Sequence, residues 1–182
     1  MNKGQKFVLS VMLGALGNVL GFSSLELLTL IHPQIALDLS HIGTFLSAGM
    51  LGPIYGGLTG IIVSVSPYIR FGLQGAYGPL FGLLIFPGKA LTGIFSSILM
   101  RKIRPFTAIV IGYVPESIFT YLTMAIWAPV FIPGISQYVT ETVILMILLK
   151  AWAEILVLAA VTEPLLRNLC KKHLIECYCE CR

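Results

Sequence analysis

Long apolar runs follow one another along almost the whole chain, separated by short polar or charged stretches. Runs such as VILMILL (143–149) and ILVLAAV (155–161) lack the apolar–polar alternation that the strands of a membrane β-barrel require. Because a helix that crosses a bilayer needs about 20 residues, the pattern predicts an all-α integral membrane protein with about six transmembrane helices. The predicted spans cover roughly residues 7–31, 40–51, 54–69, 79–100, 106–127 and 139–161.

The second and third predicted spans are short and meet at Gly52-Pro53, with no charged residue at the joint. Proline is accepted in the first turn of a helix, where its missing N–H group has no partner to lose. The pair therefore predicts a tight turn between two short helices.

Composition excludes an ordinary soluble domain. The chain has 182 residues, of which 57% are hydrophobic and 11% charged, and its mean hydropathy is +0.90. A soluble domain of this length would need far more polar surface. The apolar residues are spread over the whole chain, so they do not form a signal peptide ahead of a polar body.

Lysine and arginine gather in three places: Lys3 and Lys6 before the first span, residues 101–104 after the fourth, and residues 167–172 after the sixth. With six spans, all three groups fall on one side of the membrane. The positive-inside rule then predicts that both termini are cytoplasmic, in a multi-pass protein of the plasma membrane. The formal net charge of +4 follows from this bias. No aromatic–basic pattern indicates nucleic-acid binding.

We divide the chain into a membrane domain (1–168) and a Cys-rich cytoplasmic tail (169–182). The tail carries four cysteines and one histidine, at positions 170, 177, 179, 181 and 173. Disulfides are rare in the cytosol, and the segment CYCEC does not have the spacing of a zinc site, so we expect no bound metal.

Catalytic motifs are absent from the sequence. There is no GxxxxGK[ST] loop for ATP, no HExxH and no GxSxG. We therefore expect neither an enzyme nor a cofactor.

Charged residues inside the predicted spans are the strongest functional signal, because burying charge in hydrocarbon is unfavourable. Lys89 lies in the fourth span, and Lys150 and Glu154 lie one turn apart in the sixth. Glu116 lies in the fifth span, nearer the expected cytoplasmic side, and is a weaker ligand candidate. These groups either form a structural ion-pair network or contact a polar ligand.

Further ligand candidates lie near the expected outer side. Arg70, Gln74 and Tyr77 fall in the segment SPYIRFGLQGAYGP, where the arginine is either an anion-binding group or an interfacial anchor. Trp152 is deep enough in its span to stack on a ring. Asp38 and His41 precede or begin the second helix, as capping residues or as ligand contacts.

Glycines gather in the first predicted span, at Gly14, Gly17 and Gly21. Small residues allow membrane helices to approach closely, where packing rather than the hydrophobic effect drives association. This face either packs inside the protein or docks a partner protein.

The segment DLSHIGTFLSAGMLGPIYGGLTGIIVS (38–64) resembles the second and third helices of the substrate-binding S components of energy-coupling factor (ECF) transporters. The chain length, six spans and the Gly17–Gly21 spacing are similar as well. The resemblance implies a subunit that binds a vitamin or similar micronutrient and works with a transmembrane T subunit and two ATPases.

The resemblance also implies roles for individual residues. Gly17 and Gly21 correspond to the family's Ala-x-x-x-Ala face, which docks on the T subunit, and Lys150 resembles a ligand-facing position of the last helix. The D-x-S sequence at Asp38 resembles flavin-binding members and makes riboflavin the favoured vitamin. The chain lacks the Met-His start of the nickel and cobalt members. The alternative is a structural or assembly membrane protein that binds no solute.

Overall fold

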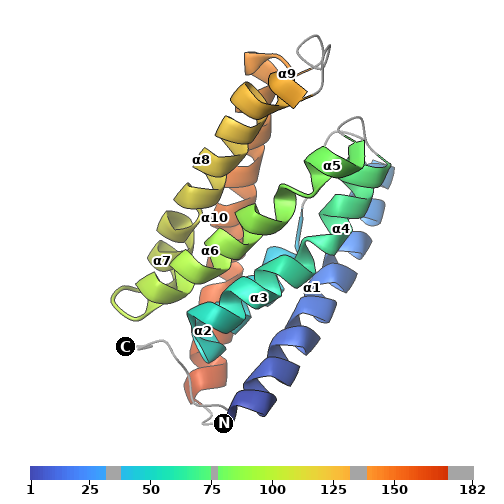
Figure 1. Cartoon of the computed structure of the whole chain (residues 1–182). Helices are drawn as coiled ribbons and strands as arrows, with labels where there is room; N and C mark the ends of the chain where they lie inside the picture. Colours follow the sequence, from blue (N-terminus) through green and yellow to red (C-terminus); the bar gives the residue numbers. More distant parts are fainter. Residues whose placement is uncertain (32–37, 75–77, 132–138, 172–182) are drawn as a thin grey trace.

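The computed structural model describes residues 1–31, 38–74, 78–131 and 139–171. All regular elements in these ranges are helical (Figure 1). In chain order they are α1 (Lys3–Ile31), α2 (His41–Leu51), α3 (Pro53–Val63), α4 (Val65–Pro67), the π-helix η1 (Tyr68–Leu73), α5 (Gly78–Gly82), α6 (Ile85–Met100), α7 (Pro105–Gly112), α8 (Val114–Leu122), the π-helix η2 (Thr123–Trp127), α9 (Ala128–Phe131) and α10 (Glu141–Lys171).

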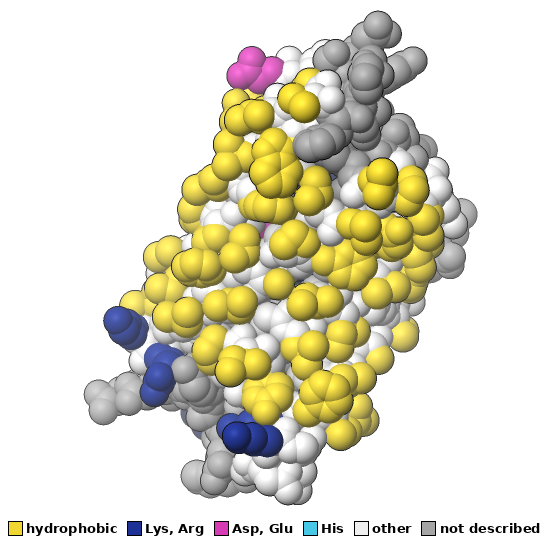
Figure 2. Space-filling model, viewed as in Figure 1, with side chains coloured by type: hydrophobic (Ala, Val, Ile, Leu, Met, Phe, Trp, Pro, Cys, Tyr) yellow, Lys and Arg dark blue, Asp and Glu magenta, His cyan; other side chains and the backbone are white. Residues whose placement is uncertain are grey.

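These elements correspond to the six predicted spans, so the all-α membrane architecture is confirmed. Within the described ranges, four segments are long and apolar enough to cross a bilayer: Lys3–Ser24, Gly78–Met100, Pro105–Val130 and Glu141–Lys171. The start of α1, the α6–α7 turn and the end of α10 lie at the same end of the molecule (Figure 1). On the face seen in Figure 2, hydrophobic side chains cover most of the surface and basic side chains gather toward that end.

Helices α2 and α3 are shorter than a bilayer crossing. Each has 11 residues, which at 1.5 Å per residue is about half the thickness of the hydrocarbon core. Nearly every residue of α2 is buried, among them Phe45 and Ala48. A helix enclosed by its neighbours does not have to match the bilayer thickness, which explains why so short a span is stable here.

The turn between α2 and α3 has the predicted tight geometry. Gly52 has φ 99° and ψ 178°, a backbone conformation that is essentially restricted to glycine. Pro53 follows as the first residue of α3. The chain therefore reverses within one residue, and α3 returns alongside α2.

Glycines also set the spacing between α3 and α6. A Cβ added at Gly56 would lie 2.7 Å from the carbonyl oxygen of Gly93, and one added at Gly60 would clash with the backbone of Lys89. Because both helices lack side chains at this crossing, their backbones touch. This contact fixes the position of Lys89 on α6 relative to α3, and so where its side chain enters the interior.

The glycine face of α1 packs inside the protein, which corrects the prediction that it docks a partner. Gly14, Gly17 and Gly21 are all buried. A Cβ at Gly14 would lie 2.6 Å from Cγ2 of Ile62, and one at Gly17 would lie 2.6 Å from Cγ1 of Val63. Helix α3 therefore occupies the space that a partner helix would need.

Asn18, between these glycines, reinforces the same contact. Its side-chain amide donates to the carbonyl of Ile62 at 2.7 Å, and its carbonyl oxygen accepts the N–H of Ser66 at 2.9 Å. In a bundle where packing and polar contacts hold helices together, this pair of bonds fixes α1 against α3 and α4.

The last helix extends beyond its predicted end near residue 161, through Pro164 to Lys171. Proline removes one backbone hydrogen bond but does not end the helix here. The proposed tail thus begins within α10, and its residues 172–182 lie outside the described part of the chain. Cys170, in the last turn of α10, is disulfide-bonded.

Candidate functional site

A cavity of about 330 Å³ lies among the helices, lined by the first residues of α6 and the first half of α10, away from the end of the molecule where both helices finish. Its walls combine aliphatic and aromatic side chains with several charged groups. The described residues that line it are Asp38, His41, Pro67, Phe71, Gly82, Leu84, Ile85, Gly88, Lys89, Tyr113, Glu116, Phe119, Thr120, Thr123, Met124, Ile147, Lys150, Ala151, Glu154 and Ile155.

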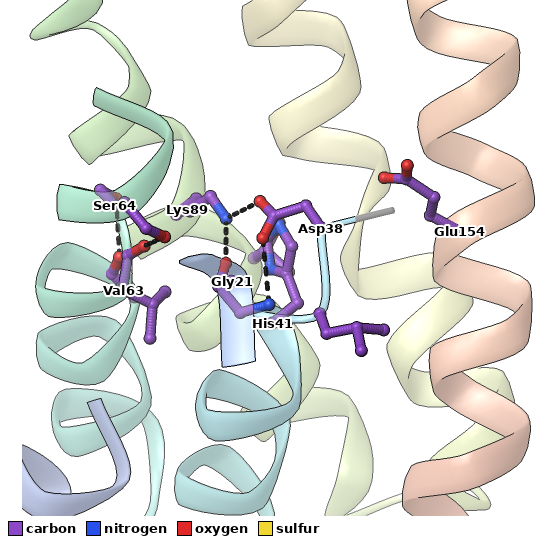
Figure 3. A network of polar contacts seen from close by, with 12 residues as sticks. Gly21, Asp38, His41, Val63, Ser64, Lys89 and Glu154 are labelled. Carbon is purple, nitrogen blue, oxygen red and sulfur yellow. Dashed lines mark hydrogen bonds and ion pairs between the residues drawn. The ribbon is translucent and has the colours of Figure 1, made fainter. Parts of the chain in front are cut away.

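Asp38 and Lys89 form a tight ion pair at one side of this cavity (Figure 3). Lys89 Nζ lies 2.6 Å from Asp38 Oδ2 and donates to Ser40 Oγ at 2.7 Å. The other carboxylate oxygen of Asp38 accepts the backbone N–H of Ser40 at 3.0 Å. The Lys89 side chain, only 4% exposed, thus ties the segment before α2 to α6.

The pKa of Asp38 reflects this pairing. Burial alone would raise the pKa of the carboxyl group, but attraction to Lys89 and His41 and the hydrogen bonds from Lys89 and Ser40 together outweigh burial and hold the pKa below its ordinary value. Asp38 is therefore charged at neutral pH. Its side chain bonds to Ser40 and does not cap α2.

Glu116 faces His41 across the cavity. Glu116 Oε2 accepts a hydrogen bond from the hydroxyl of Thr92, and Oε1 lies 3.7 Å from His41 Nε2, which is too long for a hydrogen bond. His41 Nδ1 is buried and has no hydrogen-bond partner among the described residues. The His41 ring stacks on Phe45, with ring centroids 5.6 Å apart, and this contact fixes its orientation.

Lys150 and Glu154 form a looser pair on α10. Their closest charged atoms are 3.7 Å apart, and the two side chains are 40% and 12% exposed respectively. Glu154 Oε1 is buried and lacks a hydrogen-bond partner within the described ranges. In Figure 3 the carboxylate of Glu154 points from α10 toward the Asp38–Lys89 pair.

Both π-helical segments border the cavity. Phe71 of η1 and Thr123 and Met124 of η2 line its walls. A π-helical turn widens the helix and shifts the side chains that follow, and such turns occur often at functional sites. Here they turn one aromatic, one hydroxyl and one thioether group toward the same space.

The structure brings together five of the residues predicted as ligand contacts: Asp38, His41, Lys89, Lys150 and Glu154 all line the cavity. Their contact with a ligand stays a prediction. The other four predicted residues do not line it or are not described.

Trp152 lies behind the cavity wall, edge-on to Tyr113 with ring centroids 5.2 Å apart. Arg70 in η1 and Gln74 directly after it are not among the cavity residues, because that helix turns only Phe71 inward. Tyr77 lies outside the described residues.

Glu116 is more central than the sequence indicated, and Tyr113, Thr120 and Thr123 of the same span were not predicted at all. All four line the cavity. Their spacing of three, four and three residues places them on one face of a helix. This polar stripe in an apolar span is the signal that would have identified the wall.

Comparison with known families identifies the kind of protein that contains this cavity. The family model for the substrate-specific component of ECF transporters matches residues 5–166. The chain belongs to this family. No curated protein and no solved structure gives a match to the chain. The resemblance seen in residues 38–64 is thus confirmed, and the protein is a membrane-embedded, substrate-binding S component.

Among the described residues of this S component, no group of three or more His, Cys, Asp or Glu side chains is arranged to hold a metal ion. The cysteines at 177, 179 and 181 lie outside the described residues. The described lining residues offer ion-pairing and hydrogen-bonding groups together with apolar surface.

Proposed function

We propose that this S component binds a small water-soluble micronutrient of vitamin type in the cavity and delivers it for import. The observation that carries the proposal is the gathering of buried charged groups around one hollow. Lys89, Glu116 and Glu154 come from three different helices, α6, α8 and α10. A cavity with mostly apolar walls and a few convergent polar groups is the usual form of a small-molecule site.

The size of the cavity supports a compact ligand. Its volume of about 330 Å³ lies at the lower end of the range of about 300–1,000 Å³ typical of small-molecule pockets. Phe71, Phe119 and Tyr113 supply aromatic surface. These walls suit one ring system with polar substituents better than a long chain.

The alternative, an assembly protein without a solute, gives no reason for these charges. Ion pairs buried away from water are often no more stable than apolar residues of similar volume. A protein selected only for packing would gain nothing by keeping Lys89, Glu116 and Glu154 around an unfilled space. A solute that pairs with the two glutamates gives the arrangement a purpose, with Lys89 holding the cavity wall through Asp38.

Family membership supports a proposal for the partners and for the direction of transport. We propose that the cavity opens toward the outside and that the basic end faces the cytoplasm of a cell bounded by the plasma membrane. A T subunit and two ATPases would then drive release of the solute. Since the glycines of α1 are buried, we place the T-subunit contact on surfaces other than Gly14, Gly17 and Gly21.

Riboflavin remains a candidate because of the D-x-S sequence at Asp38. However, the Asp38 carboxylate and the Ser40 hydroxyl both contact Lys89. The motif by itself therefore does not select a vitamin, and riboflavin has to be tested beside other vitamins.

The test is a binding assay on the purified protein in detergent. Trp152 touches Tyr113 of the cavity wall, so its fluorescence reports on occupancy. The variant Trp127→Phe leaves Trp152 as the sole tryptophan. We expect one of riboflavin, thiamin, folate, pantothenate, pyridoxine or biotin to give a saturable fluorescence change and a higher melting temperature. A folded protein that binds none of them would favour the assembly protein.

A further inference from the structure

The charged groups of the cavity differ in how many further hydrogen bonds each can form. This difference indicates which charge the solute carries. Lys89 is already occupied: its ammonium group contacts Asp38 at 2.6 Å and Ser40 at 2.7 Å. Because this cation is neutralised and held by its own chain, it is poorly placed to receive an acidic group of a ligand.

Glu116 is in the opposite situation. Its side chain is 11% exposed. It accepts a hydrogen bond from the Thr92 hydroxyl and lies 3.7 Å from a nitrogen of His41. No lysine or arginine among the described residues forms an ion pair with it. Lys89 attracts Glu116 from nearby, but its ammonium group is bonded to Asp38 and Ser40. Because a buried carboxylate without an ion-pair partner of its own is unfavourable, a group that brings positive charge directly to Glu116 would stabilise this wall.

Glu154 presents a second acceptor from α10, and its carboxylate also accepts a hydrogen bond from the backbone of Asp38. Its Oε1 atom is buried without a hydrogen-bond partner in the described ranges. Lys150, at 3.7 Å, is 40% exposed and so neutralises Glu154 without saturating it. Buried acceptors that are left unpaired favour a ligand rich in donors.

The charge count agrees with these contacts. Among the described residues, three carboxylates (Asp38, Glu116, Glu154) and two ammonium groups (Lys89, Lys150) line the cavity. His41 is the remaining titratable group of the lining with a nitrogen inside the pocket, and its Nδ1 is unpartnered. With both glutamates ionised, a solute with one positive charge would balance the set, whereas an anion would add to the excess.

We propose that the cavity selects a cationic ligand: a nitrogen heterocycle or amine that places positive charge and N–H donors on Glu116, with Glu154 as a second acceptor. This inference rests on the proposed function and specifies the substrate class for it. Anionic solutes are disfavoured because they would approach Glu116 without a free cation to offset the repulsion.

The experiment uses three ring probes of matched size: benzamidine, a cation at neutral pH, benzamide, which is neutral, and benzoate, an anion. Each is titrated at up to millimolar concentration into the purified full chain, with Trp152 fluorescence and melting temperature as readouts. We expect benzamidine to bind at least ~10-fold more tightly than benzoate, since hydrogen bonds to charged groups are the stronger ones.

The variant Glu116→Gln keeps the shape of the side chain and removes its charge. It should weaken benzamidine binding roughly 10-fold or more and change benzamide binding much less. The matched control is Glu141→Gln, at an exposed carboxylate on α10 that does not line the cavity, and it should bind all three probes as the wild type does. If Glu116→Gln does not fold, Glu154→Gln makes the same test.

Three outcomes would each overturn this inference. The first is that benzoate binds as tightly as benzamidine, and the second is that benzamidine does not bind the folded protein. The third is that a folded Glu116→Gln variant binds benzamidine with unchanged affinity. Tight binding of an anionic vitamin such as biotin or pantothenate would also overturn it, while the transport function would stand. Failure of every vitamin in the panel would instead overturn the proposed function itself.

Discussion

At the scale of single residues, the same types of charged group behave differently according to what encloses them. Lys89 is 4% exposed and contacts Asp38 at 2.6 Å, whereas Lys150 is 40% exposed and lies 3.7 Å from its partner. The first pair is a structural tie between the loop and α6. The second pair, Lys150 and Glu154, is partly exposed to solvent and can rearrange around a ligand.

The tie leads to a prediction for Lys89→Met. Removing the ammonium group leaves Asp38 charged and enclosed, so the free energy of unfolding should fall by about 3–5 kcal/mol. The double variant Asp38→Asn, Lys89→Met removes both charges and should recover much of that loss. Chemical unfolding of the detergent-solubilised protein measures both, and a single variant as stable as the wild type would contradict the prediction.

Sequence reasoning found part of this site because charges stand out in apolar spans. It named Lys89 and Asp38 separately, but nothing in the chain indicated that they pair, since they lie 51 positions apart on different elements. It undervalued Glu116 because depth was judged from position along the span. Only the packing of α8 against α6 shows that this carboxylate reaches the cavity.

At the scale of helices, hydrophobic runs and turn residues located the elements well. Gly52-Pro53 marked the α2–α3 turn correctly, because both residues have a strong backbone preference. The π-helical stretches after Pro67 and Leu122 and the continuation of α10 past Pro164 were not predictable. They depend on tertiary contacts that outweigh local preference.

The glycine face of α1 makes a prediction about packing. In Gly17→Leu the new side chain would meet Val63 Cγ1 and the carbonyl of Ser40, at 2.6 and 2.7 Å from its Cβ. Such overpacking should lower the free energy of unfolding by about 1–3 kcal/mol or more, and ligand affinity should fall with it. Ala15→Leu, on the exposed face of the same helix, is the control and should preserve both. A Gly17→Leu protein that keeps stability and affinity but loses uptake would restore the docking interpretation.

The α2–α3 turn makes a second prediction at this scale. Gly52→Ala forces a side chain into a conformation with φ 99°, which should reduce stability by about 1–3 kcal/mol. Gly4→Ala is the matched control, because a Cβ there meets only Asn2 Oδ1, at 3.6 Å. Thermal melting of the two variants beside the wild type tests the strain, and equal melting temperatures for all three would count against it.

At the scale of the whole molecule, the arrangement of charge links the fold to the direction of transport. The basic groups lie at the end that contains the start of α1 and the α6–α7 turn (Figures 1 and 2). The cavity is lined by the first residues of α6 and the first half of α10, away from that end. If the basic end is cytoplasmic, a solute enters from outside without crossing the core of the bundle. The orientation is therefore a requirement of the proposed function.

Cysteine labelling in intact cells tests that orientation. In a background with the four native cysteines replaced by serine, single cysteines are placed at exposed positions near the two ends: Gln74 and Glu141 near the cavity end, Lys3 and Lys102 near the basic end. A membrane-impermeant maleimide should label Gln74→Cys and Glu141→Cys in whole cells, and Lys3→Cys and Lys102→Cys only after lysis. The melting temperature of each variant serves as the folding control.

The reverse pattern would place the cavity on the cytoplasmic side and exclude uptake from outside. Labelling of one residue from each end in whole cells would place both residues on the same side of the membrane. That requires an even number of crossings between them, whereas the helix order of this fold gives an odd number.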